Sequence, residues 1–259
     1  MKILLTNDDG IKAPGLKAMA TAVEGNHECV TVAPASEKSA CGHSISLGQK
    51  LVIKELTSRR FSVYGTPADC VKFALSELGF KPDLLISGIN PGPNTGVSVY
   101  YSGTISAARE GLINQLPGIA VSIACRGARP YAPTNFSYAA SFTSWVLRGY
   151  EKGDFPRHIF LNINVPDLPE AKIRGIRIAR QASSHFVEEF IKEAAMDHQR
   201  VYRLAGEIQV FDPDGTSDDE VLSEGFISIT PLKLDLTDYG AMPVLEQWFK
   251  ETWGKPKNI

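Results

Sequence analysis

Leu4-Leu5-Thr6-Asn7-Asp8-Asp9-Gly10 is the stretch of sequence from which the fold class follows. Residues 2 to 6 form an apolar run that is too short for a helix, which predicts a buried strand ending before Gly10. Asp8 and Asp9 therefore follow the carboxyl end of a strand, where open α/β sheets bind their ligands. Adjacent carboxylates repel each other, so a divalent cation, hydrogen-bond donors or a raised pKa has to compensate. A polar turn with a helix cap is the alternative interpretation.

The bulk composition narrows the class of protein. A chain of 259 residues with 43% hydrophobic content can bury a large core. Its 27 basic and 29 acidic residues give a formal charge of -2, so we expect neither a nucleic-acid polymer nor a membrane as partner. Four scattered cysteines, with no signal peptide or membrane-length apolar run, predict reduced thiols in a cytoplasmic protein. The histidines lack metal-type spacing, which disfavours a zinc hydrolase.

Strands and helices alternate through the first 170 residues, which predicts an α/β fold with a doubly wound, mostly parallel sheet. Further strands are expected at 29–33, 83–87, 118–124 and 158–165, and helices from near Pro14, Thr66, Ser102 and Phe136. A hairpin at 51–56 and 61–64 is expected to leave the main sheet.

The pattern changes beyond about residue 171. Antiparallel strands are expected at 175–181 and 201–210, around a weakly helical segment at 187–195. An acidic loop follows at 212–220, without the spacing of an EF-hand. A strand at 225–231 and an amphipathic helix at 244–253 complete the chain. We expect one domain over 1–259, with an α/β core at about 1–170 and a carboxy-terminal part at about 171–259.

Two polar loops are expected to reach the aspartates, because parallel strands bring their carboxyl ends to one edge. The loop at 35–46 offers Ser36, Ser39, His43 and Ser44, each of which taken alone is more commonly a solvated loop residue. The loop after residue 87 is rich in glycine and proline and offers the amides of Asn90 and Asn94.

The segment Ser102-Gly103-Thr104 opens a helix of small residues near the same edge. Free N–H groups and the dipole at a helix start favour an oxyanion or a phosphate. Ordinary capping by Ser102 is the alternative. Asp69, in the sequence Thr-Pro-Ala-Asp, is assigned chiefly to capping.

Ordered motifs spread over nearly the whole chain carry a resemblance to a known family. They are Leu-Leu-Thr-Asn-Asp-Asp-Gly (4–10), Ala-Pro-Gly-Leu (13–16), Ala-Pro (33–34), Gly-Thr-Pro-Ala-Asp-Cys-Val (65–71), Ser-Gly-Ile-Asn (87–90), Gly-Pro-Asn (92–94), Tyr-Ser-Gly-Thr (101–104), Asn-Ile-Asn-Val-Pro (162–166) and Ser-Ile-Thr-Pro-Leu (228–232). The set resembles the survival protein E (SurE) family of metal-dependent nucleoside monophosphate phosphatases.

The resemblance implies a Rossmann-like, three-layer core and a carboxy-terminal part that assembles a homodimer or homotetramer. It also implies one divalent metal ion per subunit, Mg²⁺ or Mn²⁺, and a seat for the substrate phosphate. The implied metal ligands are Asp8, Asp9, Ser39 and Asn90, and the implied phosphate contacts are Asn94, Ser102, Gly103 and Thr104. Ser217-Asp218 stands where the family commonly has Thr-Asp, and because the hydroxyl is kept we expect little consequence. The loop at 35–46 is less typical of the family around Glu37-Lys38, which leaves substrate preference open.

The expected reaction is hydrolysis of nucleoside 5′-monophosphates by a metal-activated water, with 3′-monophosphates and short polyphosphate as further candidate substrates. Asp8 or Asp9 would take the proton from the water, and the residues do not choose between them. A covalent phospho-aspartate on Asp8 and a non-catalytic nucleotide sensor are the alternatives. A dinucleotide-dependent dehydrogenase is disfavoured because Asn7-Asp8-Asp9-Gly10 replaces the glycine-rich fingerprint.

The carboxy-terminal tail carries many apolar side chains for a terminus. They are Leu234, Leu236, Tyr239, Met242, Val244, Leu245, Trp248, Phe249 and Trp253. Such a tail needs a surface to cover, either on its own core or on a second subunit. We expect a homodimer at least.

Overall fold

The computed structural model describes residues 1–125, 136–153, 155–196, 199–211 and 213–253. Its main sheet consists of β1 (Lys2–Thr6), β2 (Glu28–Pro34), β3 (Ile53–Thr57), β4 (Arg60–Val63), β5 (Leu84–Pro91), β6 (Gly118–Ala124), β7 (Phe160–Pro166), β8 (Ile176–Ile178) and β11 (Ile227–Leu232). The strand order is β3-β4-β2-β1-β5-β6-β7-β11-β8. Strands β4, β2, β1, β5, β6 and β7 are parallel to their neighbours in this series, which confirms the predicted α/β class.

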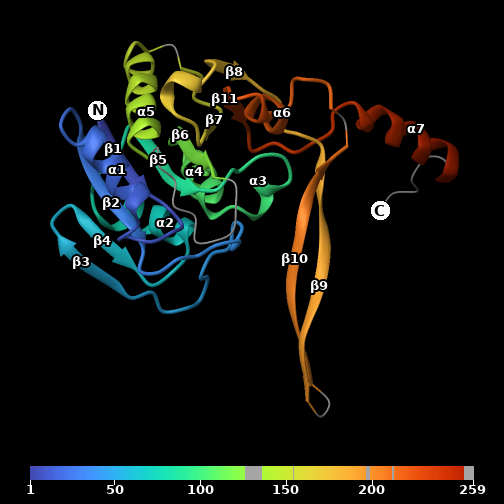
Figure 1. Cartoon of the computed structure of the whole chain (residues 1–259), viewed down its shortest axis with the longest axis horizontal. Coiled ribbons are helices and arrows are strands. Elements are labelled where there is room, and N and C mark those ends of the chain that lie inside the picture. The colour runs from blue at the N-terminus through green and yellow to red at the C-terminus, as the bar shows by residue number, and fades with distance from the viewer. Residues whose placement is uncertain (126–135, 154, 197–198, 212, 254–259) are drawn as a thin grey trace.

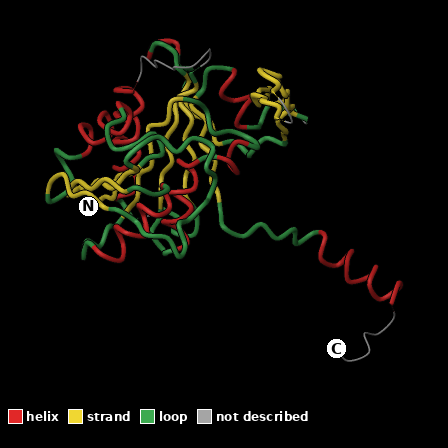
Figure 2. The backbone as a smooth tube through the Cα atoms, turned by 90° about the horizontal axis from the view of Figure 1, so that it is seen from below, coloured by secondary structure: helices red, strands yellow, loops and turns green. Residues whose placement is uncertain are grey.

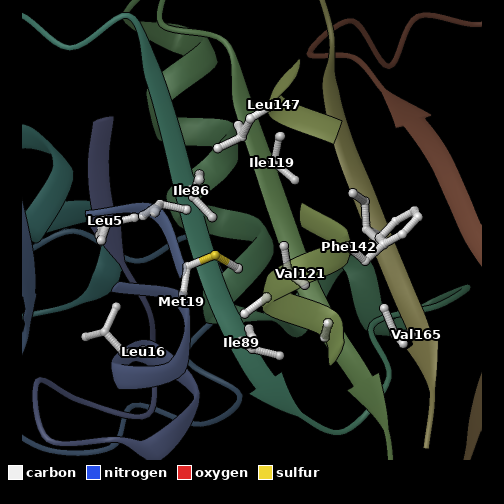
Figure 3. Close-up of a cluster of buried hydrophobic side chains, with 14 of the residues drawn as sticks. Leu5, Leu16, Met19, Ile86, Ile89, Ile119, Val121, Phe142, Leu147 and Val165 are labelled. Carbon is white, nitrogen blue, oxygen red and sulfur yellow. The ribbon is translucent and has the colours of Figure 1, made fainter. Parts of the chain in front are cut away.

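Helices cover both faces of the sheet. They are α1 (Pro14–Val23), α2 (Pro67–Glu77), α4 (Gly103–Ile113) and α5 (Phe136–Glu151). Side chains of α1 and α5 pack on one face in a single cluster, in which Met19 lies on the side of Leu5 and Ile86 and Phe142 on the side of Val121 and Val165 (Figure 3). Side chains of α2 and α4 pack on the opposite face, around the alternate strand residues. The alternation of Ile3, Leu4 and Leu5 between the two clusters is what a strand buried on both faces requires.

Strand β1 is the switch point of the sheet. It pairs in parallel with β2 through Leu4 and Val30, and with β5 through Leu4 and Leu85. The chain therefore moves to one side of β1 first and to the other side later, and the ligand crevice expected of such a sheet lies beyond the carboxyl ends of β1 and β5. The residues that follow β1 are Asn7, Asp8 and Asp9.

The hairpin of β3 and β4 belongs to the main sheet, so the expectation that it leaves the sheet is wrong. Val32 of β2 pairs in parallel with Phe61 of β4, and β3 then forms the edge of the sheet. Phe61 is buried in the core cluster under α2, and this burial holds the hairpin in place. The strand expected at 175–181 is shortened to β8, which pairs in parallel with β11 and not in an antiparallel manner.

The helix expected at 187–195 is also wrong. Residues 184–196 form β9 (Ser184–Met196), which pairs along its whole length with β10 (Gln199–Val210) as an antiparallel arm. Figure 1 shows this arm extending away from the body. Glutamate, lysine and alanine favour a helix locally, but cross-strand pairs such as Phe190 with Leu204 favour the strand.

The last helix, α7 (Ala241–Trp253), stands away from the body on an extended linker (Figures 1 and 2). The large apolar side chains described in α7 are exposed, from Met242 at 46% to Val244 at 67%. The tail therefore does not fold back on its own core.

All four cysteines are free thiols, as predicted. No helix in the described segments is long and apolar enough to cross a membrane.

Candidate active site

Asp8 lies against the start of α4, at the end of β1. The hydroxyl of Thr104 donates a hydrogen bond of 2.6 Å to Asp8 Oδ1. A Cβ atom on Gly103 would lie 2.6 Å from Asp8 Cβ, so only glycine permits this close packing. Burial raises the pKa of Asp8, the bond from Thr104 partly offsets this, and the charge of Glu37 raises it further. A carboxylate that is 5% exposed in such surroundings gains from a bound cation.

A tight turn holds Asp8 and Asp9 at this position. Asn7 is fully buried, its amide donates to the carbonyl oxygen of Gly10 at 3.1 Å, and its Oδ1 accepts from the Gly10 N–H at 3.2 Å. Gly10 has a φ of +104°, in the region that favours glycine. Asn7 thus has a structural role, and Asp9, next to it, is half-buried at the crevice.

The loop at 35–46 reaches the aspartates, as the sequence predicted. The Lys38 N–H donates to the main-chain oxygen of Asp8 at 2.8 Å, and the Gly42 N–H donates to that of Tyr101 at 2.9 Å. Ser39, the implied metal ligand in this loop, is exposed and its hydroxyl donates to Glu37. Glu37 therefore lies beside an implied metal ligand, and its charge acts on Asp8. The sequence analysis gave it no role, although it noted that Glu37-Lys38 is less typical of the family.

His43 anchors this loop to α4. Its Nε2 lies 2.8 Å from Oε2 of Glu110, whose other oxygen lies 2.7 Å from Lys72 Nζ. Burial acts to raise the pKa of Glu110, but hydrogen bonds from His43, Lys72 and Asn114 lower it overall. His43, a candidate polar group of the loop, therefore has a positioning role, and the acidic partner in α4 was not foreseen.

Asn90 and Asn94 lie on the β5 side of the crevice, and their amides are engaged differently. Asn90 Nδ2 donates to the Gly92 oxygen at 2.7 Å, so its Oδ1 is the end that a cation would bind. Asn94 is buried, and its Nδ2 donates to Ser122 Oγ at 2.8 Å.

The main chain of Asn94 is held by two buried asparagines of β7. Its N–H donates to Asn164 Oδ1 at 2.8 Å, and its oxygen accepts from Asn162 Nδ2 at 2.7 Å. Asn162 and Asn164 are polar residues at alternate positions of an apolar strand. The motif at 162–166 contributed to the family resemblance, but the sequence analysis gave these two asparagines no role of their own.

The start of α4 combines capping with the geometry of an anion seat. The hydroxyl of Ser102 accepts from the Ile105 N–H at 3.1 Å, which is the capping contact weighed as an alternative. The hydroxyl of Thr104 is bound to Asp8. What remains for a ligand is the pair of main-chain N–H groups of Gly103 and Thr104, which as the first two of the helix have no acceptor within it.

The donor set fits a hard divalent cation better than zinc. No group of three or more His, Cys, Asp or Glu residues in the described segments has the geometry to hold a metal ion. The candidate ligands are instead two carboxylates, Asp8 and Asp9, with neutral oxygens from Ser39 and Asn90. All four are oxygen donors of the kind that Mg²⁺ and Mn²⁺ prefer.

Asp69 has the capping role that the sequence assigned to it. It forms a capping box with Thr66 at the start of α2 and also accepts from Ser46. Asp218, in the acidic loop at 212–220, is the second residue of another capping segment, Ser217 to Glu220, and is fully buried. Asp212 of that loop lies outside the described residues.

Comparisons with known proteins show the family of this chain. The family described as "Survival protein SurE" matches residues 3–188. A "5'-nucleotidase SurE" from Desulfatibacillum aliphaticivorans is 42% identical over 96% of this chain and 98% of its own length. Another from Moorella thermoacetica is 40% identical over 98% of each chain.

A solved structure shows the same fold. The crystal structure of the SurE protein from Aquifex aeolicus superposes with a TM-score of 0.82 at 33% identity, over 96% of this chain and 99% of that one. With a family match across most of the core and relatives alike over nearly their full length, this chain belongs to the SurE family of survival proteins.

Proposed function

We propose that this chain is a 5′-nucleotidase that hydrolyses nucleoside 5′-monophosphates with the help of one divalent metal ion. The observation that supports the proposal is the packing of Asp8 against Gly103 and Thr104, because the Asp8 carboxylate, which Asp9 follows directly in the sequence, lies beside the start of a helix. The relatives named as 5′-nucleotidases supply the reaction class.

Asp8, Asp9, Ser39 and Asn90 would hold the ion. When bound, Mg²⁺ or Mn²⁺ lowers the pKa of a water and neutralises charge on the phosphoryl group. The Thr104 hydroxyl orients Asp8 by occupying one lone pair of its Oδ1.

We assign the substrate phosphate to the first turn of α4 together with Asn94, and call these residues the phosphate seat. The main-chain N–H groups of Gly103 and Thr104 would orient the phosphoryl oxygens for in-line attack. Asp8 or Asp9 would accept the proton of the attacking water.

The covalent alternative is less well supported. Asp8 Oδ1 is bonded to Thr104, and Oδ2 lies where even a Cβ atom on Gly103 would come within 2.8 Å. That packing favours a fixed ligand over a nucleophile that must accept a phosphoryl group.

The test is phosphate release from nucleoside 5′- and 3′-monophosphates and polyphosphate, with and without added Mg²⁺ or Mn²⁺. We expect release from the 5′-monophosphates that disappears on chelation and returns with the metal. Nucleotide binding without any release would instead identify a sensor, and a trapped phosphoprotein would identify the covalent route.

Asp9→Asn provides the matched variant. We expect it to abolish metal-dependent turnover and to leave the fold intact, because it removes one ligand charge and one source of repulsion. Asp83→Asn is the control. Asp83 directly precedes β5, at the amino end of that strand, whereas the site lies at the carboxyl ends, and its carboxylate accepts from the Lys2 N–H. Near-normal activity of Asp9→Asn after metal is restored would refute the two-aspartate site.

We further propose that the chain assembles as a homodimer or homotetramer through its carboxy-terminal part. Large apolar side chains of α7 and of the β9–β10 arm, such as Val244, Phe190 and Leu204, are exposed in the single chain. Exposed apolar surface of this extent is typical of an interface between subunits.

A further inference from the structure

Asp218 joins three segments that are far apart in the chain. It has no exposed surface, and its carboxylate accepts hydrogen bonds from three main-chain N–H groups. The donors are Gly96 at 3.1 Å, Ala182 at 2.9 Å and Asp219 at 3.0 Å. Gly96 lies 122 residues from Asp218, in the loop that contains Asn94. A buried carboxylate with three main-chain donors holds those segments in one arrangement.

Its neighbours complete a clamp around residues 95–97. The Thr95 hydroxyl donates to Asp219 Oδ1 at 2.6 Å, and the Val97 N–H donates to Ser184 Oγ at 2.9 Å. Gly96 has a φ of +49°, and a Cβ atom there would lie 2.3 Å from Ser184 Oγ and 3.0 Å from Asp219 Oδ2. The carboxy-terminal part therefore encloses the loop and leaves no room for a side chain at Gly96.

The short helix α3 (Ser98–Tyr101) connects this clamp to α4. The Ser98 N–H donates to the Thr95 oxygen at 3.0 Å, and the Val99 N–H donates to the Gly96 oxygen at 3.3 Å. At the other end of α3, the Ser102 N–H donates to the Ser98 oxygen at 3.0 Å. Ser102 is the cap of α4. An unbroken run of hydrogen bonds thus leads from the clamp to the cap of α4.

We propose that Asp218 and Asp219 are positioning residues for the reaction, which hold residues 95–97 and thereby set the position of the phosphate seat. This inference rests on the proposed function, because it takes the start of α4 and Asn94 as the place of the phosphate. The two aspartates do not touch the substrate. They act through Thr95 and Gly96.

The clamp also includes the base of the β9–β10 arm. Ser184, which accepts from Val97, is the first residue of β9, and the Phe211 N–H closes the arm by donating to the Ser183 oxygen at 2.8 Å. A displacement of the arm at its base therefore reaches the loop of the phosphate seat through one hydrogen bond.

Thr95→Val tests the clamp with the least change in shape, and Asp219→Asn removes the charge on the other side of the same contact. We expect each to raise the KM for a nucleoside 5′-monophosphate and the Kd for inorganic phosphate by about tenfold, which corresponds to the loss of one charge-assisted hydrogen bond. We expect kcat to change less than twofold. Amide hydrogen exchange of residues 95–102 should become faster in the full-length protein.

Two variants serve as controls. Thr95→Ser keeps the hydroxyl and should restore the wild-type KM and exchange. Glu224→Gln removes a charge at the end of α6 (Asp218–Ser223), where Glu224 pairs with Arg177 and not with the clamped loop, and should change neither.

The outcomes separate this inference from the proposed function. If the wild type hydrolyses nucleotides but Thr95→Val and Asp219→Asn keep its KM, phosphate Kd and exchange rates, the positioning role is refuted. A fall in kcat alone, in step with the folded fraction, also refutes it. If the wild type hydrolyses no nucleotide, the proposed function fails, while faster exchange and weaker phosphate binding would still support the clamp.

Discussion

The burial of Asp218 makes ionisation of its carboxyl group unfavourable in the folded protein. Burial raises its pKa to about 6 from an ordinary value of 3.8, with hydrogen bonds from Ala182 and Gly96 opposing the shift and the charge of Asp219 adding to it. The native protein therefore holds a proton on Asp218 between about pH 4 and pH 6, where the unfolded chain has released it. By linkage, this carboxyl contributes stability below pH 4 that is lost as the pH rises through 6.

Asp218→Asn tests this sign. The amide does not titrate, so the stability of the wild type relative to the variant should fall by about 3 kcal/mol between pH 4 and pH 7. Urea unfolding of both proteins at several pH values measures the difference. A difference that is constant with pH, or that grows in favour of the wild type as the pH rises, would show that Asp218 has no raised pKa.

The same residues show what sequence reasoning can reach at this scale. Asp8 and Asp9 were identifiable because they are local: two carboxylates directly after an apolar run must lie at a strand end. The bond from Thr104 to Asp8 and the bond from Gly96 to Asp218 join residues 96 and 122 positions apart. No local pattern encodes such a pairing, since it arises only when the elements have packed.

At the scale of elements, the close packing of α1 on β5 fixes the position of the strand segment that contains Asn90. A Cβ atom on Gly15, near the start of α1, would lie 2.0 Å from the main-chain oxygen of Ile89, just before Asn90. Main-chain atoms of a central strand have little freedom to move, so any side chain at this position must push the helix away.

Gly15→Ala should therefore destabilise the protein by about 3 kcal/mol, at the upper end for overpacking. It should also weaken metal binding, because Asn90 shifts with β5. Gly25→Ala is the control, since Gly25 follows α1 with no atom within 4 Å of the added Cβ. Urea unfolding and calorimetry with Mn²⁺ measure the two effects. Equal stability of the two variants would contradict the close packing.

The elements also show where prediction from sequence ends. The buried parallel strands were predicted because each is a short apolar run between glycine or proline residues. Residues 187–195 were misassigned because their composition favours a helix, and the strand forms only through pairing with 199–210. The hairpin at 53–63 was placed outside the sheet because the parallel pairing of β4 with β2 is not visible in either strand alone.

At the scale of the whole molecule, the tail is separate from the core of its own chain. The two buried clusters of the described residues reach no further along the chain than Ile229 and Leu232. The exposed tail begins immediately after them, and Leu236 is 79% exposed. The apolar surface of the tail therefore makes no contribution to the core of the single chain, and its burial requires a second molecule.

Deleting the residues after Lys233 should consequently change assembly first and activity only through assembly. No proposed site residue lies in that segment, and the core keeps every buried side chain. The thermal midpoint should fall and lose its dependence on protein concentration, because subunit association stabilises the folded chain by mass action. Trp248→Glu in the full-length chain should have the same effect, whereas Glu251→Gln on the same helix should not. Sedimentation of the intact protein across micromolar concentrations decides the matter: a monomer throughout would refute the proposed oligomer, and α7 would then require a different partner.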